Sequence, residues 1–152
     1  MKKPYLQKIQ SGYFLRLKLS KFSQLKSRIK KNEGYSNQIY YDQVGKPTIG
    51  FGHLIKKREK FLHQKKYSKK HLNKLFENDF SSALSDFNKS YETQGLSKNS
   101  QEVLLEMIYQ LGIKGCLKFK KFNKSLEKKL PYMAALEMLN SHWYVQTPKR
   151  VE

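Results

Sequence analysis

The amino-acid sequence predicts an α+β fold, in which a small β-containing region precedes a body made mostly of helices. Residues 35–54 combine strand-forming side chains with glycine and proline turn signals. From residue 68 onward, apolar residues recur at the spacing of one helical face in several successive segments. A short run of strands followed by a run of helices is typical of an α+β domain.

The first 32 residues contain ten lysines and arginines and no acidic residue. Their apolar residues fit two helical faces separated near Ser20, which predicts a basic helical extension over residues 1–20 and another helix after it. These apolar residues are Leu6, Ile9, Tyr13, Phe14 and Leu17, followed by Phe22, Leu25 and Ile29. Two interpretations stay open: helices that pack on the body, or a basic amphipathic element that binds anionic lipid or lipopolysaccharide.

The region after the first helices predicts short strands and then a lysine-rich connection. Strands are expected at residues 39–41 and 48–52, joined by a turn that contains Gly45 and Pro47. The connection covers residues 56–70.

The rest of the chain predicts helices. A long helix is expected to start near Ser68, which is a suitable N-cap. Its apolar residues at helical spacing are Leu72, Leu75, Phe76, Phe80, Ala83, Leu84 and Phe87. A further helix is expected at residues 103–111, with Gly112 and Gly115 as its stops. Two more are expected at residues 122–129 and 131–141.

The composition indicates a folded, strongly basic domain. The 152 residues are 38% hydrophobic, and 31 Lys and Arg against 12 Asp and Glu give a formal charge of +19. This charge predicts attraction to polyanions, whether nucleic acid, an anionic membrane or an acidic cell wall.

Several classes of protein are not expected. Cys116 is the only cysteine, which excludes an internal disulfide, and the four histidines show no paired ligand spacing with it, so we expect no metal and no cofactor. No apolar run approaches the roughly 18 residues of a membrane span. Charged residues interrupt the N-terminal region, so a cleaved signal peptide is not expected.

Residues 33–53 carry the strongest indication of chemistry. Glu33 and Asp42 lie nine residues apart, Thr48 follows six residues later, and His53 ends the segment. Each of these residues alone has an ordinary structural explanation. Together they provide two carboxyl groups, as hydrolysis of a glycosidic bond requires: one to donate a proton and one to manage water or the oxocarbenium-like centre.

The same segment resembles the active-site segment of the phage-type lysozymes, glycoside hydrolase family 24. The resemblance rests on Glu33-Gly34, the aspartate nine residues after Glu33, and the sequence TIGFGH at residues 48–53. Three further stretches agree in the same order with a linking helix, a cleft-facing helix and a C-terminal signature of that family. They are KLFEND at 74–79, MIYQLG at 107–112 and SHWYVQTPKR at 141–150.

The resemblance implies the catalytic roles. Glu33 would be the general acid, which needs a carboxyl that stays protonated near neutral pH. Asp42 would stay ionised, stabilise the developing positive charge and orient water, and Thr48 would hold that water through its hydroxyl. The family inverts the anomeric centre, so the two carboxyl groups are expected to be about 6.5–9.5 Å apart.

The resemblance also implies supporting residues. Leu54, Tyr109 and Gln110 would bind substrate in the cleft. His53 and Asp79 would form a structural ion pair between the small lobe and the connecting helix, and Arg150 would pair with the catalytic glutamate. Trp143 would lie in the core.

The implied fold has two lobes joined by a long helix. The lysozyme-like domain would cover residues 21–152, with a small lobe at about residues 33–70 and a helical lobe at about residues 71–152 that includes the first helix. The chain is shorter than the family between His53 and Asp79 and has the extension at residues 1–20. We expect that extension to occupy the groove that a C-terminal helix fills in the family.

The implied function is that of an endolysin-type muramidase that cleaves the β-1,4 bond between N-acetylmuramic acid and N-acetylglucosamine in peptidoglycan. The enzyme would be a monomer that binds an anionic wall or lipopolysaccharide surface by charge and no specific nucleic acid. It would be made in the cytoplasm and reach the wall by holin-like release. Two alternatives stay open, a basic nucleic-acid-binding protein and a membrane-disrupting protein without catalysis.

Overall fold

The protein's structure, a computed structural model, describes residues 22–92 and 95–139 of the chain. Within these residues it has five helices and one three-stranded sheet, which confirms the predicted α+β class. The elements in chain order are α2 (Ser23–Glu33), β1 (Ser36–Tyr41), β2 (Pro47–Gly50), β3 (His53–Leu54), α3 (Lys69–Ser90), α4 (Lys98–Leu117), α5 (Lys120–Glu127) and α6 (Pro131–Leu139). The predicted extension at residues 1–20, Trp143 and Arg150 lie outside the described residues.

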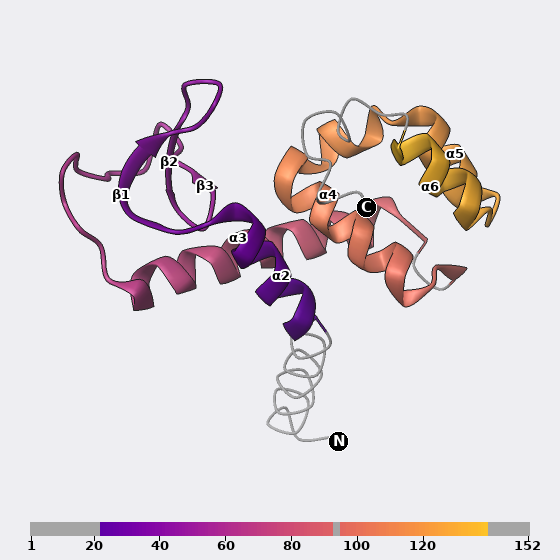
Figure 1. The fold of residues 1–152 in the computed structure, drawn as a ribbon, viewed down its shortest axis with the longest axis horizontal. Helices are drawn as coiled ribbons and strands as arrows, with labels where there is room; N and C mark the ends of the chain where they lie inside the picture. Colours follow the sequence, from indigo (N-terminus) through magenta and orange to yellow (C-terminus); the bar gives the residue numbers. More distant parts are fainter. Residues whose placement is uncertain (1–21, 93–94, 140–152) are drawn as a thin grey trace, which may run out of the picture.

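Figure 1 shows an elongated molecule with the sheet at one end and α4, α5 and α6 at the other. We call the sheet and the connection at residues 55–68 the small lobe, and α4 to α6 the helical lobe. Helix α3 runs from one to the other, and α2 crosses it and leads into the sheet. The predicted arrangement of two lobes joined by a long helix is confirmed. None of the helices in the described part of the chain is long and apolar enough to cross a membrane.

The sheet is antiparallel, with strand order β1-β2-β3. Thr48 lies opposite Tyr40 on one side and opposite Leu54 on the other, so these three side chains share one face of the sheet. A register shift between Ser36 and Tyr40 interrupts the β1–β2 ladder. Strand β3 has only two residues, which is why the sequence pattern did not separate it from β2.

Helix α3 begins where the sequence predicted. The Ser68 hydroxyl accepts a hydrogen bond from the backbone N–H of His71 (3.2 Å), which satisfies one of the free donors of the first turn. The face that turns to the core consists of Leu72, Phe76, Phe80, Ala83 and Phe87, all buried.

Helix α4 is longer than predicted and is interrupted. It begins at Lys98 with Ser97 as its N-cap and has non-helical angles at Gly112 (φ 70°, ψ 163°). The prediction that Gly115 stops the helix is wrong, because the chain resumes helical geometry and continues to Leu117. Cys116, which is fully buried, packs this last segment into the core.

The turn from α5 to α6 is a Schellman motif with an unusual residue. Leu130 N–H donates to Ser125 O and Lys129 N–H donates to Leu126 O (both 2.9 Å), the two bonds that define the motif. Lys129 holds the left-handed position (φ 55°), where glycine is the common residue.

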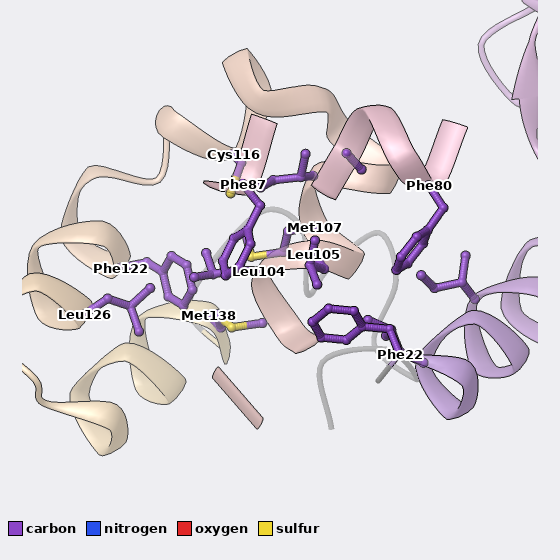
Figure 2. Packing of buried hydrophobic residues seen from close by; sticks show 14 of the residues in the cluster. Phe22, Phe80, Phe87, Leu104, Leu105, Met107, Cys116, Phe122, Leu126 and Met138 are labelled. Atoms are coloured by element: carbon purple, nitrogen blue, oxygen red, sulfur yellow. The ribbon is translucent and has the colours of Figure 1, made fainter. Parts of the chain in front are cut away.

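The hydrophobic core joins all five helices of the described residues. Figure 2 shows Phe22 before α2 and Phe80 on α3 on one side of the core, and Phe122, Leu126 and Met138 from α5 and α6 on the other. Leu104, Leu105 and Met107 of α4 lie between them and are fully buried. Helix α2 therefore belongs to the helical core, although its last residue reaches the sheet.

Candidate active site

Glu33 ends helix α2, and its half-buried side chain points to the turn between β2 and β3. A Cβ at Gly52 would lie 2.7 Å from Glu33 Oε2 and 3.2 Å from Cδ, so the backbone of this turn comes directly against the carboxyl group. Gly52 has φ +78°, a conformation that favours glycine. Glycine at this position allows the close approach, and the turn thus fixes where the carboxyl group of Glu33 lies.

Asp42 lies in the turn between β1 and β2. Its Oδ1 accepts hydrogen bonds from the backbone N–H of Val44 (2.9 Å) and of Lys46 (2.8 Å). The backbone N–H of Asp42 donates to Lys46 O (3.0 Å), which extends the ladder by one residue pair. These bonds hold the carboxylate in one orientation. Among the described residues, no hydrogen bond to Oδ2 is found, so this second oxygen can meet a solvent molecule.

Thr48 is buried on the same sheet, with 4% of its surface exposed. Its Oγ1 donates to Lys46 O (3.0 Å), so the hydroxyl proton is engaged while the oxygen can still accept a hydrogen bond. Asp42 follows Tyr40 by two residues, and Thr48 lies opposite Tyr40. The three side chains therefore lie on one face of the β1–β2 hairpin.

Tyr40 lies close enough to Glu33 and Asp42 for their negative charges to change its pKa. Burial raises the pKa of the Tyr40 phenol above its ordinary value, and the negative charges of Glu33 and Asp42 raise it further. Sequence reasoning missed this residue. The sequence did contain the information, because side chains two residues apart in a strand lie on the same face of the sheet, and Tyr40 is two residues before Asp42.

A cleft of about 430 Å³ opens between the two lobes. The three residues predicted to bind substrate, Leu54, Tyr109 and Gln110, all line it, from β3 on one side and α4 on the other. Glu33, Asp42 and Thr48 are not among its lining residues. Asp42 and Thr48 adjoin it through Lys46, which lines the cleft and whose backbone binds both of them.

Tyr109 connects the cleft to the carboxyl group of Glu33. Its hydroxyl donates to the backbone carbonyl of Phe51 (2.9 Å), in the turn that contacts Glu33, and its ring packs against Phe76 (5.4 Å between centroids). Burial raises the pKa of the Tyr109 phenol, and the charges of Asp79 and Glu33 add to this effect. Tyr109, on the helical lobe, is thus held in place by the small lobe and by α3.

His53 is buried between two carboxylates. Its Nδ1 lies 2.6 Å from Asp79 Oδ2 and its Nε2 lies 3.0 Å from Glu59 Oε2, which connects β3 to α3 and to the small-lobe connection. Burial alone would lower the pKa of His53, but hydrogen bonds and charge from Asp79 and Glu59 raise it above the ordinary value. Among the described residues, no group of His, Cys, Asp and Glu is arranged to hold a metal ion.

A family model described as phage lysozyme matches residues 30–151. The chain belongs to the phage lysozyme family. It is 34% identical over 151 residues to "Probable T4-type lysozyme 2" of Dictyostelium discoideum, a match that covers 84% of this chain and 89% of the relative. It is 32% identical to "Probable T4-type lysozyme 1" of the same organism, with the same coverage.

A third relative is the "Pre-baseplate central spike protein Gp5" of Enterobacteria phage T4, which is 27% identical over 147 residues. This match covers 80% of the chain but only 25% of that protein. Membership of the phage lysozyme family makes the protein a glycoside hydrolase of the lysozyme type, whose substrate is peptidoglycan, and its α+β fold is lysozyme-like.

In this member of the phage lysozyme family, α4 holds the end of α2 that carries Glu33. Arg28 Nε donates to Glu106 Oε2 (3.1 Å) and Arg28 Nη1 donates to Glu102 Oε2 (3.3 Å). Asn32, the residue before Glu33, donates to Glu106 Oε1 (2.9 Å). Glu102 and Glu106 are buried, at 9% and 5% exposure. Both oxygens of Glu106 are thus engaged by the last two turns of α2.

Helix α3 holds the other side of α2. Lys26 forms an ion pair with Glu77, and Lys30 Nζ donates to Asn73 Oδ1 (2.9 Å). The Lys30 ammonium also lies over the Phe76 ring (4.5 Å), and burial lowers its pKa. Polar contacts on both sides therefore fix α2 above α3 and α4.

Sequence reasoning missed Glu59, Glu102 and Glu106. Glu59 is the only acidic residue at positions 43–76, which is a usable signal in so basic a segment. Glu102 and Glu106 are one helical turn apart, so they share one face of α4, and that face is buried in the structure. The predicted partner Arg150 lies outside the described residues.

Proposed function

We propose that the enzyme cleaves the β-1,4 bond between N-acetylmuramic acid and N-acetylglucosamine by inverting hydrolysis, with Glu33 as general acid and Asp42 and Thr48 as the residues that manage water. The observation that supports this assignment best is the position of the Glu33 carboxyl against Gly52, on a different element from Asp42. Two carboxyl groups presented by a helix end and a hairpin turn can act on opposite sides of a sugar ring.

Glu33 would donate its proton to the glycosidic oxygen as the bond to the anomeric carbon breaks. The charged contacts that fix α2 on two sides and the close backbone of Gly52 limit the positions that the carboxyl group can adopt. Restricting a proton donor in this way supports catalysis, because misplacement of a reacting group by about 1 Å can lower the rate about a hundredfold.

Asp42 and Thr48 would hold the attacking water. Asp42 Oδ1 is occupied by two backbone N–H groups, which leaves Oδ2 for the water, and the Thr48 oxygen can accept a hydrogen bond from the same water. The water oxygen would attack the anomeric carbon from the face opposite the leaving group, and Asp42 would take up its proton. Inversion of the anomeric centre follows from attack on that face.

The strong positive charge supports binding to an anionic wall. A net charge of +19 raises the local concentration of the enzyme at a polyanion and increases the rate of encounter. Hydrolysis of peptidoglycan by an enzyme held at the wall would lead to lysis of the bacterial cell.

The test compares the native protein with Glu33→Gln on purified peptidoglycan, with release of reducing ends as the readout. We expect the variant to lose about 10³-fold in kcat/KM, since general acid catalysis contributes roughly 10²–10⁴. Glu92→Gln, at an exposed acid two residues after α3, is the matched control and should keep full activity. Equal release of reducing ends by Glu33→Gln and by the native enzyme would refute the assignment.

A separate measurement tests the stereochemistry. Proton NMR during the first turnovers distinguishes the two anomers of the new reducing end. The α-anomer from the β-linked substrate is expected for inversion, and the β-anomer would show retention.

A further inference from the structure

The outer face of helix α6 is apolar although it faces solvent. Of the eleven large hydrophobic side chains that are exposed in the described residues, six lie between residues 117 and 139. Four of them are on α6, namely Tyr132, Met133, Leu136 and Leu139, and the other two are Leu117 at the end of α4 and Leu130 just before α6. Exposed apolar side chains gathered on one helix of a basic protein need an explanation, because exposed apolar surface often marks an interaction site.

Helical geometry places three of the exposed α6 side chains on the side away from the core. Ala134 and Met138 are the buried residues of α6. Tyr132, Leu136 and Leu139, at spacings of four and three residues, lie on the opposite side of the same helix. Tyr132 is 86% exposed, and Leu136 is 51% exposed. These side chains thus form a stripe that the helical core does not use.

The outer face of the neighbouring helix α5 is cationic. Phe122 and Leu126 face the core, as Figure 2 shows, so Lys120 and Lys124 point away from it, and Lys121 and Lys128 flank them. All four lysines are exposed, and none forms an ion pair with a residue that the structure describes. Glu127 is the acidic residue on this face.

The two outer faces belong to one surface. Helices α5 and α6 lie side by side at the end of the molecule opposite the sheet (Figure 1), and the Schellman turn connects them tightly. The apolar stripe of α6 therefore lies next to the lysines of α5. Lys129 is not counted, because its side chain lies back against Gly95.

We propose that this surface, called the α5–α6 surface, binds the headgroup region of an anionic lipid bilayer. A stripe of Tyr and Leu side chains can enter the interface between headgroups and acyl chains, while lysines remain at the anionic headgroups. A soluble polyanion would use the lysines but gains nothing from Leu136 and Leu139. A second copy of the chain would bring two sets of unpaired lysines together, which costs free energy.

The position of the surface is compatible with catalysis. It lies on the helical lobe, at the far end of the molecule from the sheet that carries Asp42 and Thr48 (Figure 1). Membrane binding would hold the enzyme at the inner boundary of the wall with its cleft free for peptidoglycan. The proposal goes beyond the hydrolytic function and does not depend on it.

The experiment measures co-sedimentation of the full chain with vesicles of phosphatidylcholine that contain phosphatidylglycerol, and with vesicles of phosphatidylcholine alone. We expect binding only to the anionic vesicles. Lys120→Gln/Lys124→Gln/Lys128→Gln should weaken it about a hundredfold, at about fivefold per lysine near the surface. Tyr132→Ser/Leu136→Ser should weaken it about tenfold, since two interfacial side chains are lost.

A matched variant separates this surface from the overall charge. Lys57→Gln/Lys60→Gln/Lys66→Gln removes three exposed lysines from the small lobe and should change binding less than threefold. All variants replace exposed residues, so melting temperatures and hydrolysis of soluble peptidoglycan fragments should stay unchanged. These two measurements confirm that each variant is folded.

Several outcomes would overturn the proposal. Equal weakening by the two lysine triples would show attraction by net charge alone. Unchanged binding of Tyr132→Ser/Leu136→Ser would show that the apolar stripe does not meet lipid. Absence of binding to anionic vesicles would refute the proposal. If sedimentation velocity then showed a dimer that Tyr132→Ser/Leu136→Ser dissociates, the surface would be assigned to a second copy of the chain.

Discussion

At Gly52 the backbone of the small lobe comes so close to Glu33 that a side chain at this position would have to displace the Glu33 carboxyl group. The contact between Gly52 and Glu33 joins helix α2 to the sheet. The geometry of this contact therefore determines how Glu33 faces Asp42 and Thr48. Tyr109 supports the same turn from the other lobe through its hydrogen bond to Phe51. Three residues distant in sequence thus meet at one turn.

Gly52→Ala should reduce both activity and stability. The new Cβ would lie 2.7 Å from Glu33 Oε2, and we expect kcat to fall about 10–100-fold as the carboxyl group moves. The left-handed backbone adds a loss of about 1–2 kcal/mol in the free energy of unfolding. Gly45→Ala is the control, with φ +77° and no atom within 4 Å of the new Cβ. Equal kcat losses in the two variants would contradict the role of Gly52.

His53 should make stability depend on pH. Its pKa is raised in the folded state, so its contribution is complete below the unfolded value of about 6.5 and is lost as pH rises through the folded value. Glu59 has a lowered pKa, so its contribution is complete above about 4.5 and is lost as pH falls through its folded value. The free energy of unfolding should therefore be greatest near pH 4.5–6.5 for this pair.

Chemical denaturation across pH checks this expectation. His53→Asn should abolish most of the decrease in the free energy of unfolding above about pH 6.5. Glu59→Gln should make the same decrease smaller. His63→Asn, on the surface of the small lobe, is the control and should keep the native dependence on pH. The same slope in His53→Asn and the native protein would argue against His53 as its origin.

Residues such as Glu59, Glu102 and Glu106 show why the candidate site could be predicted only in part. The spacing of Glu33, Asp42 and Thr48 is local, and the sequence displays it directly. The partner of Glu106 is Arg28, 78 positions away, and that of His53 is Asp79, 26 positions away. Only a known pattern, such as the family resemblance, connects residues at such distances before the chain is folded.

At the scale of elements, hydrophobic periodicity and helix caps predicted which helices exist better than they predicted where each helix begins and ends. Helix α3 was predicted well, since Ser68 supplies a cap and five buried residues repeat on one face. The end of α4 was predicted wrongly at Gly115, because burial of Cys116 outweighs the weak helix propensity of one glycine. Tertiary packing thus decided where this helix ends.

The contact between α2 and α4 should be tested by Glu106→Gln. The change keeps the shape but removes the charge that meets Arg28, and we expect a loss of about 1–2 kcal/mol in the free energy of unfolding. This estimate allows for the exposure of Arg28, whose side chain is 45% exposed. A fall in kcat should accompany it, since Asn32 loosens beside Glu33.

Glu77→Gln is the matched control on α3. Its side chain is 44% exposed, and exposed ion pairs contribute about 0–1 kcal/mol, so stability should change little. Urea denaturation and initial rates on peptidoglycan measure both effects. If Glu106→Gln and Glu77→Gln behaved alike, the buried carboxylate would have no special role in holding α2.

At the scale of the whole molecule, the charge of +19 should make activity on intact walls depend on salt. The screening length falls from about 30 Å at 0.01 M salt to about 8 Å at 0.15 M, which weakens attraction to a polyanion. Initial rates on intact walls should therefore decrease over this range. Rates on short uncharged oligosaccharide fragments should change much less, and an equal decrease for both substrates would point to an effect on the catalytic site itself.

The turn at Lys129 shows that this chain is not at its stability optimum. A lysine in a left-handed C′ position costs about 1 kcal/mol relative to glycine, so Lys129→Gly should raise the melting temperature by a few degrees. Part of this gain is offset because the lysine stem no longer covers Gly95. A thermal melt of the variant measures the difference. Because the site is far from the cleft, the substitution offers a starting point for a more heat-resistant form of the enzyme with unchanged catalysis.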